Sequence, residues 1–143
     1  MKKGIFVILL CMFVLVACSQ NKNELYDVSY EPQTSETVKI ITEKESYTEN
    51  DTLIRYSIMN VGNVQVGIAA DSDCFELQKM VDGKWKRVET KIEHYWTALG
   101  QILEPNDIDE RELHLDEYFY LPLETGEYRI VVENFASNSF VIS

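Results

Sequence analysis

The chain has 143 residues, which is enough for one domain and too few for two of ordinary size. Its 13 basic and 24 acidic residues give a formal net charge of −11. A surface of this sign repels nucleic acid and anionic lipid headgroups, so we expect no nucleic-acid partner. Solubility is the simplest role for this charge, although it also suits cations and basic partners.

Residues 1–17 have the pattern of a cleaved export signal. Lys2 and Lys3 precede an apolar run, which is shorter than the roughly 20 residues needed to span a bilayer. The run ends in the tetrapeptide LVAC at 15–18, which resembles the lipobox of bacterial lipoproteins. The resemblance implies a diacylglycerol on Cys18, cleavage in front of it, and anchoring at the extracellular face of the bacterial cell membrane. The alternative is an ordinary signal peptide followed by a chance cysteine.

Residues 18–36 follow the leader as a polar segment that contains Asn, Gln, Ser and Glu. This composition predicts a flexible tether carrying the lipidated Cys18. A diacylglycerol has two acyl chains, about the number that stable anchoring requires. Apolar residues between Leu25 and Tyr30 interrupt the polarity, so this part could instead pack on the domain or add an edge strand.

From residue 37 to residue 143, apolar and polar side chains alternate, which is the pattern of half-buried strands. The alternating sets are Val38 and Ile40; Ile54, Tyr56 and Ile58; Val64, Val66 and Ile68; Tyr128, Ile130 and Val132; Phe140 and Ile142. Turn-forming residues separate the sets at intervals that suit a sandwich or barrel. We therefore predict an all-β domain, an antiparallel sandwich of seven to nine strands.

The clearest local signal is Asp82-Gly83, because both central positions of a type I′ turn need a positive φ. It predicts a tight hairpin between strands at 75–81 and 84–88. A further strand is expected at 109–115, before a crossover. The stretch 93–103 fits either a loop that leads into a strand or a single helical turn.

Four motifs occur in the same order as in a known family. They are SYTEND at 46–51, a hairpin with VDGKW at 81–85, ILEP at 102–105 and LETGEYRI at 123–130. Together they resemble the bacterial Ig-like domain of small surface lipoproteins from Gram-positive bacteria. The resemblance covers nearly all of 37–143. It implies an Ig-like β-sandwich with no catalytic residues to carry over.

Two residues in these motifs bear on the fold. Asn106 stands where the family usually has Gly, and Asn is the next best residue for a left-handed turn. Tyr128 is either a tyrosine corner, whose hydroxyl bonds back across the preceding connection, or simply a buried strand aromatic.

No catalytic constellation is evident. Three cysteines occur, and only Cys74 lies outside the leader and the lipidation site, so the domain is expected to fold without a disulfide. Cys74 is either a small buried hydrophobe or, alternatively, a reactive thiol or one half of an intermolecular disulfide. His94 and His114 have no spacing suited to zinc. We therefore predict that the protein is not an enzyme.

Calcium is the one cofactor for which the sequence offers candidate ligands. Glu104, Asp107, Asp109 and Glu110 form an acidic cluster that could supply the several oxygens that calcium requires. Solvated loop charge is the simpler interpretation, so no cofactor is the main expectation and a calcium-dependent surface module is an alternative.

Aromatic residues in connections are the candidates for binding. The candidates are Tyr95 and Trp96, or Tyr118, Phe119 and Tyr120. They could be exposed there and bind an envelope protein or a glycan. They could also cover the open ends of the sandwich. The expected function is a non-enzymatic binding or structural module on a membrane-anchored extracellular lipoprotein. A protease inhibitor acting through the loop 91–100 is the alternative.

Overall fold

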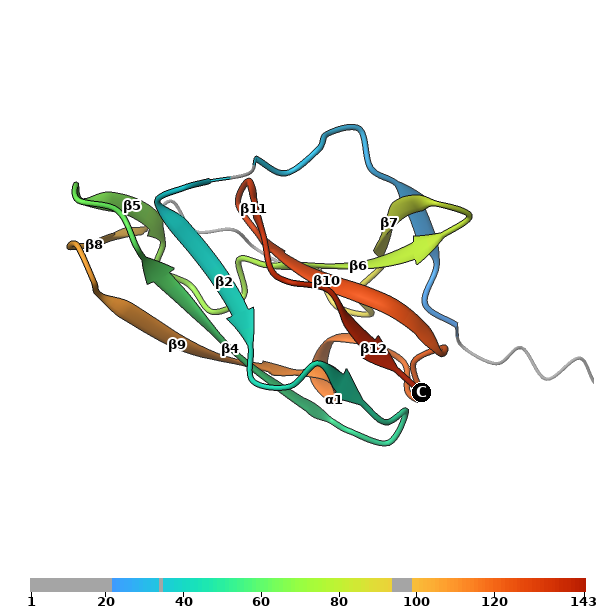
Figure 1. The fold of residues 1–143 in the computed structure, drawn as a ribbon. Helices are drawn as coiled ribbons and strands as arrows, with labels where there is room; N and C mark the ends of the chain where they lie inside the picture. Colours follow the sequence, from blue (N-terminus) through green and yellow to red (C-terminus); the bar gives the residue numbers. More distant parts are fainter. Residues whose placement is uncertain (1–21, 34, 94–98) are drawn as a thin grey trace, which may run out of the picture.

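The structure is a computed structural model that describes residues 22–33, 35–93 and 99–143. It contains twelve strands and one short helix (Figure 1). They are β1 (Leu25–Asp27), β2 (Val38–Thr42), β3 (Ser46–Tyr47), β4 (Leu53–Asn60), β5 (Val66–Ala69), β6 (Glu76–Val81), β7 (Lys84–Val88), β8 (Gly100–Leu103), β9 (Ile108–His114), α1 (Leu115–Tyr118), β10 (Gly126–Val132), β11 (Phe135–Ala136) and β12 (Phe140–Ile142). The strand number exceeds the predicted seven to nine because several elements have only two or three residues.

Two sheets form the sandwich. The larger sheet has the order β1-β7-β6-β10-β12-β3, with β11 paired to β10, and the smaller sheet has the order β2-β4-β9. Every pair of strands is antiparallel except β12 with β3, which run parallel. The expected all-β, Ig-like sandwich is therefore confirmed, with one parallel pair that the sequence did not indicate.

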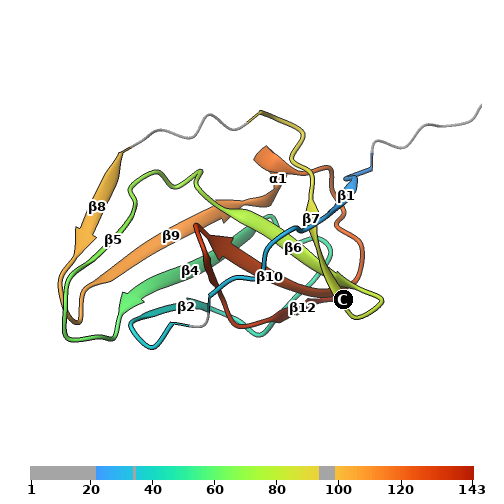
Figure 2. The ribbon, with the colours of Figure 1, turned by 90° about the horizontal axis from the view of Figure 1, so that it is seen from above.

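Strands β5 and β8 form a separate two-stranded ribbon. The ribbon follows β4 and precedes β9, and both views place it at the end of the molecule away from β1 (Figures 1 and 2). The Asn60 amide ties the junction together by donating to the Val64 carbonyl at 2.8 Å and the Leu103 carbonyl at 2.9 Å. Val64 was expected on an inner strand face. It lies outside β5 and is exposed, so that part of the prediction is wrong.

The core lies between the sheets and follows the predicted alternation. Ile54 and Ile58 of β4 are fully buried, as are Tyr128 and Ile130 of β10. Burying one such aliphatic side chain contributes roughly 1.5–3 kcal/mol, so these inward rows carry much of the stability. Most outward positions between them are half-buried, and Arg55 and Glu127 are exposed. This contrast with the fully buried inward rows supports the register.

The predicted turns have the expected conformations. Asp82 and Gly83 have φ angles of 51° and 75°, as a type I′ hairpin requires, and they join β6 to β7. Asn106 has φ 71°, which is the left-handed conformation that Asn tolerates well. The Tyr128 hydroxyl donates to the Glu124 carbonyl at 2.6 Å, so Tyr128 forms a tyrosine corner as well as packing in the core.

The segment before residue 34 lies along the domain wherever it is described. Strand β1 pairs with β7 as an added edge strand, and the Tyr30 hydroxyl donates to Glu76 Oε2 at 2.7 Å. Gln33 forms a bridge to Phe135. Both possibilities for Leu25–Tyr30 are therefore observed, since Leu25–Asp27 adds an edge strand and Tyr30 packs on the domain. Within the described residues, no helix is long and apolar enough to cross a membrane.

Candidate functional site

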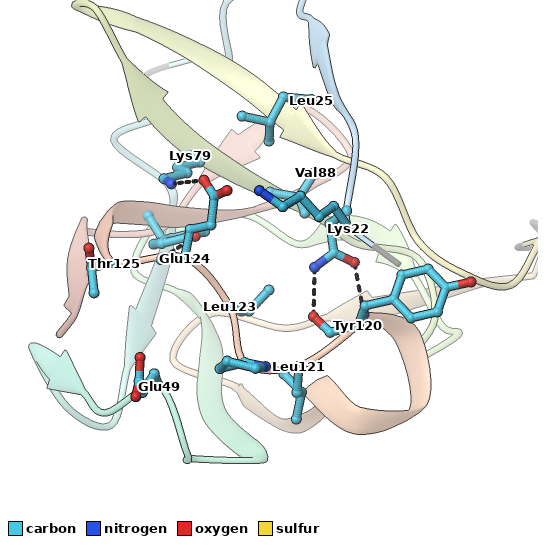
Figure 3. Close-up of a pocket in the computed structure, with 13 residues that line it drawn as sticks. Lys22, Leu25, Glu49, Lys79, Val88, Tyr120, Leu121, Leu123, Glu124 and Thr125 are labelled. Carbon is cyan, nitrogen blue, oxygen red and sulfur yellow. Dashed lines mark hydrogen bonds and ion pairs between the residues drawn. The ribbon is translucent and has the colours of Figure 1, made fainter. Parts of the chain in front are cut away.

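A pocket lined by both polar and apolar residues lies at the end of the molecule where β1 and the connection between α1 and β10 meet (Figure 3). Its volume is about 610 Å³. Lys79 on β6 projects into it, and its ammonium group donates to Glu124 Oε2 at 2.8 Å. The same ammonium lies 5.8 Å from the centroid of the Tyr128 ring. The pocket's one buried cation is therefore already neutralised within the part of the chain that the structure describes.

Gly126 makes room for this lysine. Its φ is 151°, and a Cβ there would lie 2.9 Å from Lys79 Cε. A larger residue would therefore push the lysine away from Glu124. The glycine and tyrosine of the TGEY motif thus serve one local structure, in which the tyrosine corner and the ion pair share the Glu124 residue.

The Lys79–Glu124 ion pair makes the unfolding free energy of the domain depend on pH. The hydrogen bond from Lys79, followed by its charge, lowers the pKa of Glu124 below the ordinary value of 4.5. A carboxylate with a lowered folded-state pKa contributes stability above its unfolded pKa and loses it as the pH falls through the folded value. Between about pH 6 and about pH 3, the wild type should therefore lose more unfolding free energy than Glu124→Gln in urea titrations. The difference should vanish in a Lys79→Met background.

A second polar cluster joins the β5–β8 ribbon to β9. The Arg111 guanidinium is buried and donates through Nε to Asp109 Oδ2 at 2.7 Å. Its other nitrogens reach the Asp71 carbonyl at 3.0 Å and the Ala69 carbonyl. Asp109 also accepts a bond from Gln101 Nε2 at 2.7 Å. These contacts of Arg111 join β9 to the end of β5, and so they fix the position of the β5–β8 ribbon.

The four predicted calcium ligands do not converge. Asp107 Oδ2 accepts from the Glu104 backbone N–H at 2.9 Å and so closes the turn before β9. Asp109 points inward to Arg111, whereas Glu110 is exposed and, as the next residue of the strand, points to the opposite face. Across residues 22–33, 35–93 and 99–143, no three His, Cys, Asp or Glu side chains are placed to hold a metal ion. Asp107 thus stabilises a turn, and Asp109 pairs with Arg111.

Two of the predicted binding aromatics are core residues. Tyr118 is 8% exposed and Phe119 is 1% exposed, so the expectation that they are exposed is wrong. Both rings pack edge-on against Phe75, with centroids 5.0 Å and 6.4 Å away. They instead cover the end of the sandwich, which was the other interpretation of these aromatics.

Several of the remaining predicted residues are either outside the described part of the chain or buried. Tyr95 and Trp96, together with His94 and half of the loop 91–100, lie outside the described residues, as does Cys18. Cys74 is free and buried, and burial raises the pKa of its thiol. That environment opposes a thiolate and fits the small-hydrophobe interpretation rather than the reactive one.

Sequence reasoning missed a group of exposed aliphatic residues on and beside the β5–β8 ribbon. We call them the ribbon-end residues: Val61, Val64, Leu99, Ile102 and Ile108. Their exposed fractions run from 39% to 68%, and they are five of the ten large hydrophobic residues exposed in the described chain. Single exposed aliphatics are ordinary, but a group at one end of a domain is typical of a contact surface. The residue paired with Ile102 across the ribbon is Gly67, which has no side chain. The Ile102 side chain is therefore not covered from that strand.

The fold defines the chain as an Ig-like β-sandwich. A family model described as a bacterial Ig-like domain matches residues 34–140. The chain therefore belongs to the bacterial Ig-like domain family, which indicates a non-enzymatic surface module.

Other comparisons add little. No curated protein matches the sequence. One similar solved structure is a β-glucosidase from Erythrobacter marinus, at 16% identity and a TM-score of 0.40. The match covers 73% of this chain and 15% of that one, so the chain spans less than a sixth of that protein. A likeness at this level carries no argument about activity.

Proposed function

We propose that this chain is a lipoprotein anchored by Cys18 at the extracellular face of the bacterial cell membrane, and that its Ig-like domain binds a protein through the ribbon-end residues. The observation that carries the proposal is that five exposed aliphatic residues lie on or beside the β5–β8 ribbon. Both views place this ribbon at the end of the domain away from β1 (Figures 1 and 2). Apolar surface of this kind supplies binding energy when a partner removes it from water.

The chemistry of this end favours a protein over a glycan. Glycan sites commonly use exposed aromatic rings. The two large exposed aromatics of the described chain are Tyr26, on β1, and Tyr120, in the pocket beside β1, and β1 lies away from the ribbon (Figures 2 and 3). Glu104 and Asp107 flank the ribbon-end residues. A partner surface with aliphatic and basic residues would therefore be complementary in both shape and charge.

Site-specific photo-crosslinking in the living bacterium tests the binding surface. A photoreactive residue at position 102 should give discrete cross-linked products, because it would lie inside the interface. The same residue at position 141 is the matched control, since Val141 is also an exposed strand residue but lies on β12. Equal product patterns from the two positions would refute the assignment of the surface.

The anchor is tested separately. Labelled palmitate should enter the wild-type chain and should not enter Cys18→Ser. Incorporation into the variant would show that Cys18 is not the lipidation site.

A further inference from the structure

The described chain is fastened to the domain very soon after Cys18. The Asn23 side chain donates through Nδ2 to the Tyr120 carbonyl at 2.7 Å and accepts the Tyr120 N–H through Oδ1 at 2.8 Å. Figure 3 shows this pair of bonds at Tyr120. Two residues later, Leu25 begins β1 and packs against the core. The body of the domain thus starts at Asn23.

This position limits how far the domain can stand from a lipid on Cys18. Five Cα–Cα steps separate residues 18 and 23, and a fully extended chain advances at most about 3.6 Å per residue. The Asn23–Tyr120 contact therefore lies no more than about 18 Å from the lipidated residue. That reach is shorter than β4 alone, whose eight residues extend about 26 Å at roughly 3.3 Å each.

From this geometry we propose that the end of the domain formed by Asn23, Tyr120 and Thr125 is its membrane-facing surface, and that its partner is the phospholipid bilayer holding the anchor. The proposal rests on the lipidation of Cys18 proposed above. The β5–β8 ribbon lies at the other end of the molecule, so it points away from the bilayer (Figures 1 and 2).

One further observation supports this orientation. The Tyr120 ring is 37% exposed at this end. Tyrosine is enriched at the headgroup level of membranes because its ring is apolar and its hydroxyl is polar.

Energy transfer to the membrane surface tests the orientation. The lipidated protein is placed in phosphatidylcholine vesicles that contain a headgroup-labelled acceptor lipid. A donor dye is attached through an azide-bearing amino acid at position 125 or at position 67, both of which are exposed. Position 67 suits the dye because a side chain there meets no neighbouring atom within 4 Å. Transfer from position 125 should be several-fold higher than from position 67.

A spacer provides the matched control. Inserting a Gly-Ser segment of about 20 residues after Ser19 leaves the domain unchanged but lets it tumble on a longer chain. The difference between the two dye positions should then largely disappear. Equal transfer from both positions at native tether length, or higher transfer from position 67, would overturn the proposal.

The failure of the anchor can be told apart from the failure of the orientation. If the bacterium attaches no lipid, the mature chain beginning at Cys18 is coupled through that thiol to a maleimide-bearing lipid, which restores the same tether length. A position-dependent signal from this conjugate would support the orientation even though the lipidation proposal had failed. A uniform signal would overturn the orientation alone.

Discussion

Replacing Arg111 with methionine should lower the unfolding free energy by about 3–5 kcal/mol, the range observed when one partner of a buried ion pair is removed. The change leaves Asp109, whose side chain is 23% exposed, without its ion-pair partner. It also takes the donors away from the Ala69 and Asp71 carbonyls. Urea unfolding followed by tryptophan fluorescence measures the loss.

Arg55→Met is the matched control. Arg55 also pairs with carboxylates, Glu112 at 2.9 Å and Glu43 at 3.9 Å, but its side chain is 56% exposed, against 4% for Arg111. Exposed ion pairs contribute about 0–1 kcal/mol, so the control should remain close to the wild type. Similar losses in the two variants would show that the buried network around Arg111 does not stabilise the fold as argued.

Replacing Phe119 with alanine should cost about 3–5 kcal/mol, as for other buried phenylalanines. The ring is almost completely buried and packs against Phe75, so its removal leaves a cavity at the end of the sandwich. Thermal unfolding followed by circular dichroism would show a much lower midpoint, with little change in the native spectrum at low temperature.

The neighbouring residue provides the comparison. Tyr120→Ala removes a partly exposed ring but keeps both bonds to Asn23, because those bonds use the Tyr120 backbone. A surface substitution of this kind usually changes stability by less than about 0.5 kcal/mol. If Phe119→Ala were equally mild, the assignment of Phe119 to the core would be wrong.

Much of the fold could be predicted because its strands alternate cleanly. Val38, Ile54, Tyr128 and Phe140 lie in the expected strands with buried side chains, and the Asp82-Gly83 hairpin formed as its turn chemistry requires. These features are local, since alternation and turn preference act over a few residues.

The contacts between distant segments were harder to foresee. Tyr118 and Phe119 are buried because α1, a single turn, directs the chain under the end of the sheet, and four residues give too short a pattern to reveal a helix. The inward position of Arg111 had a signal that was overlooked. It lies two residues before the buried Leu113 and therefore shares its face of β9.

Strand β1 has a practical consequence for any shortened form of the protein. Its three residues cover the edge of β7, which would otherwise present unpaired backbone groups to other molecules. A truncation that begins at residue 37, where the alternating pattern starts, would remove that cover. Such a fragment would be prone to self-association through the bared edge, whereas one that begins at residue 22 would keep its edge protected.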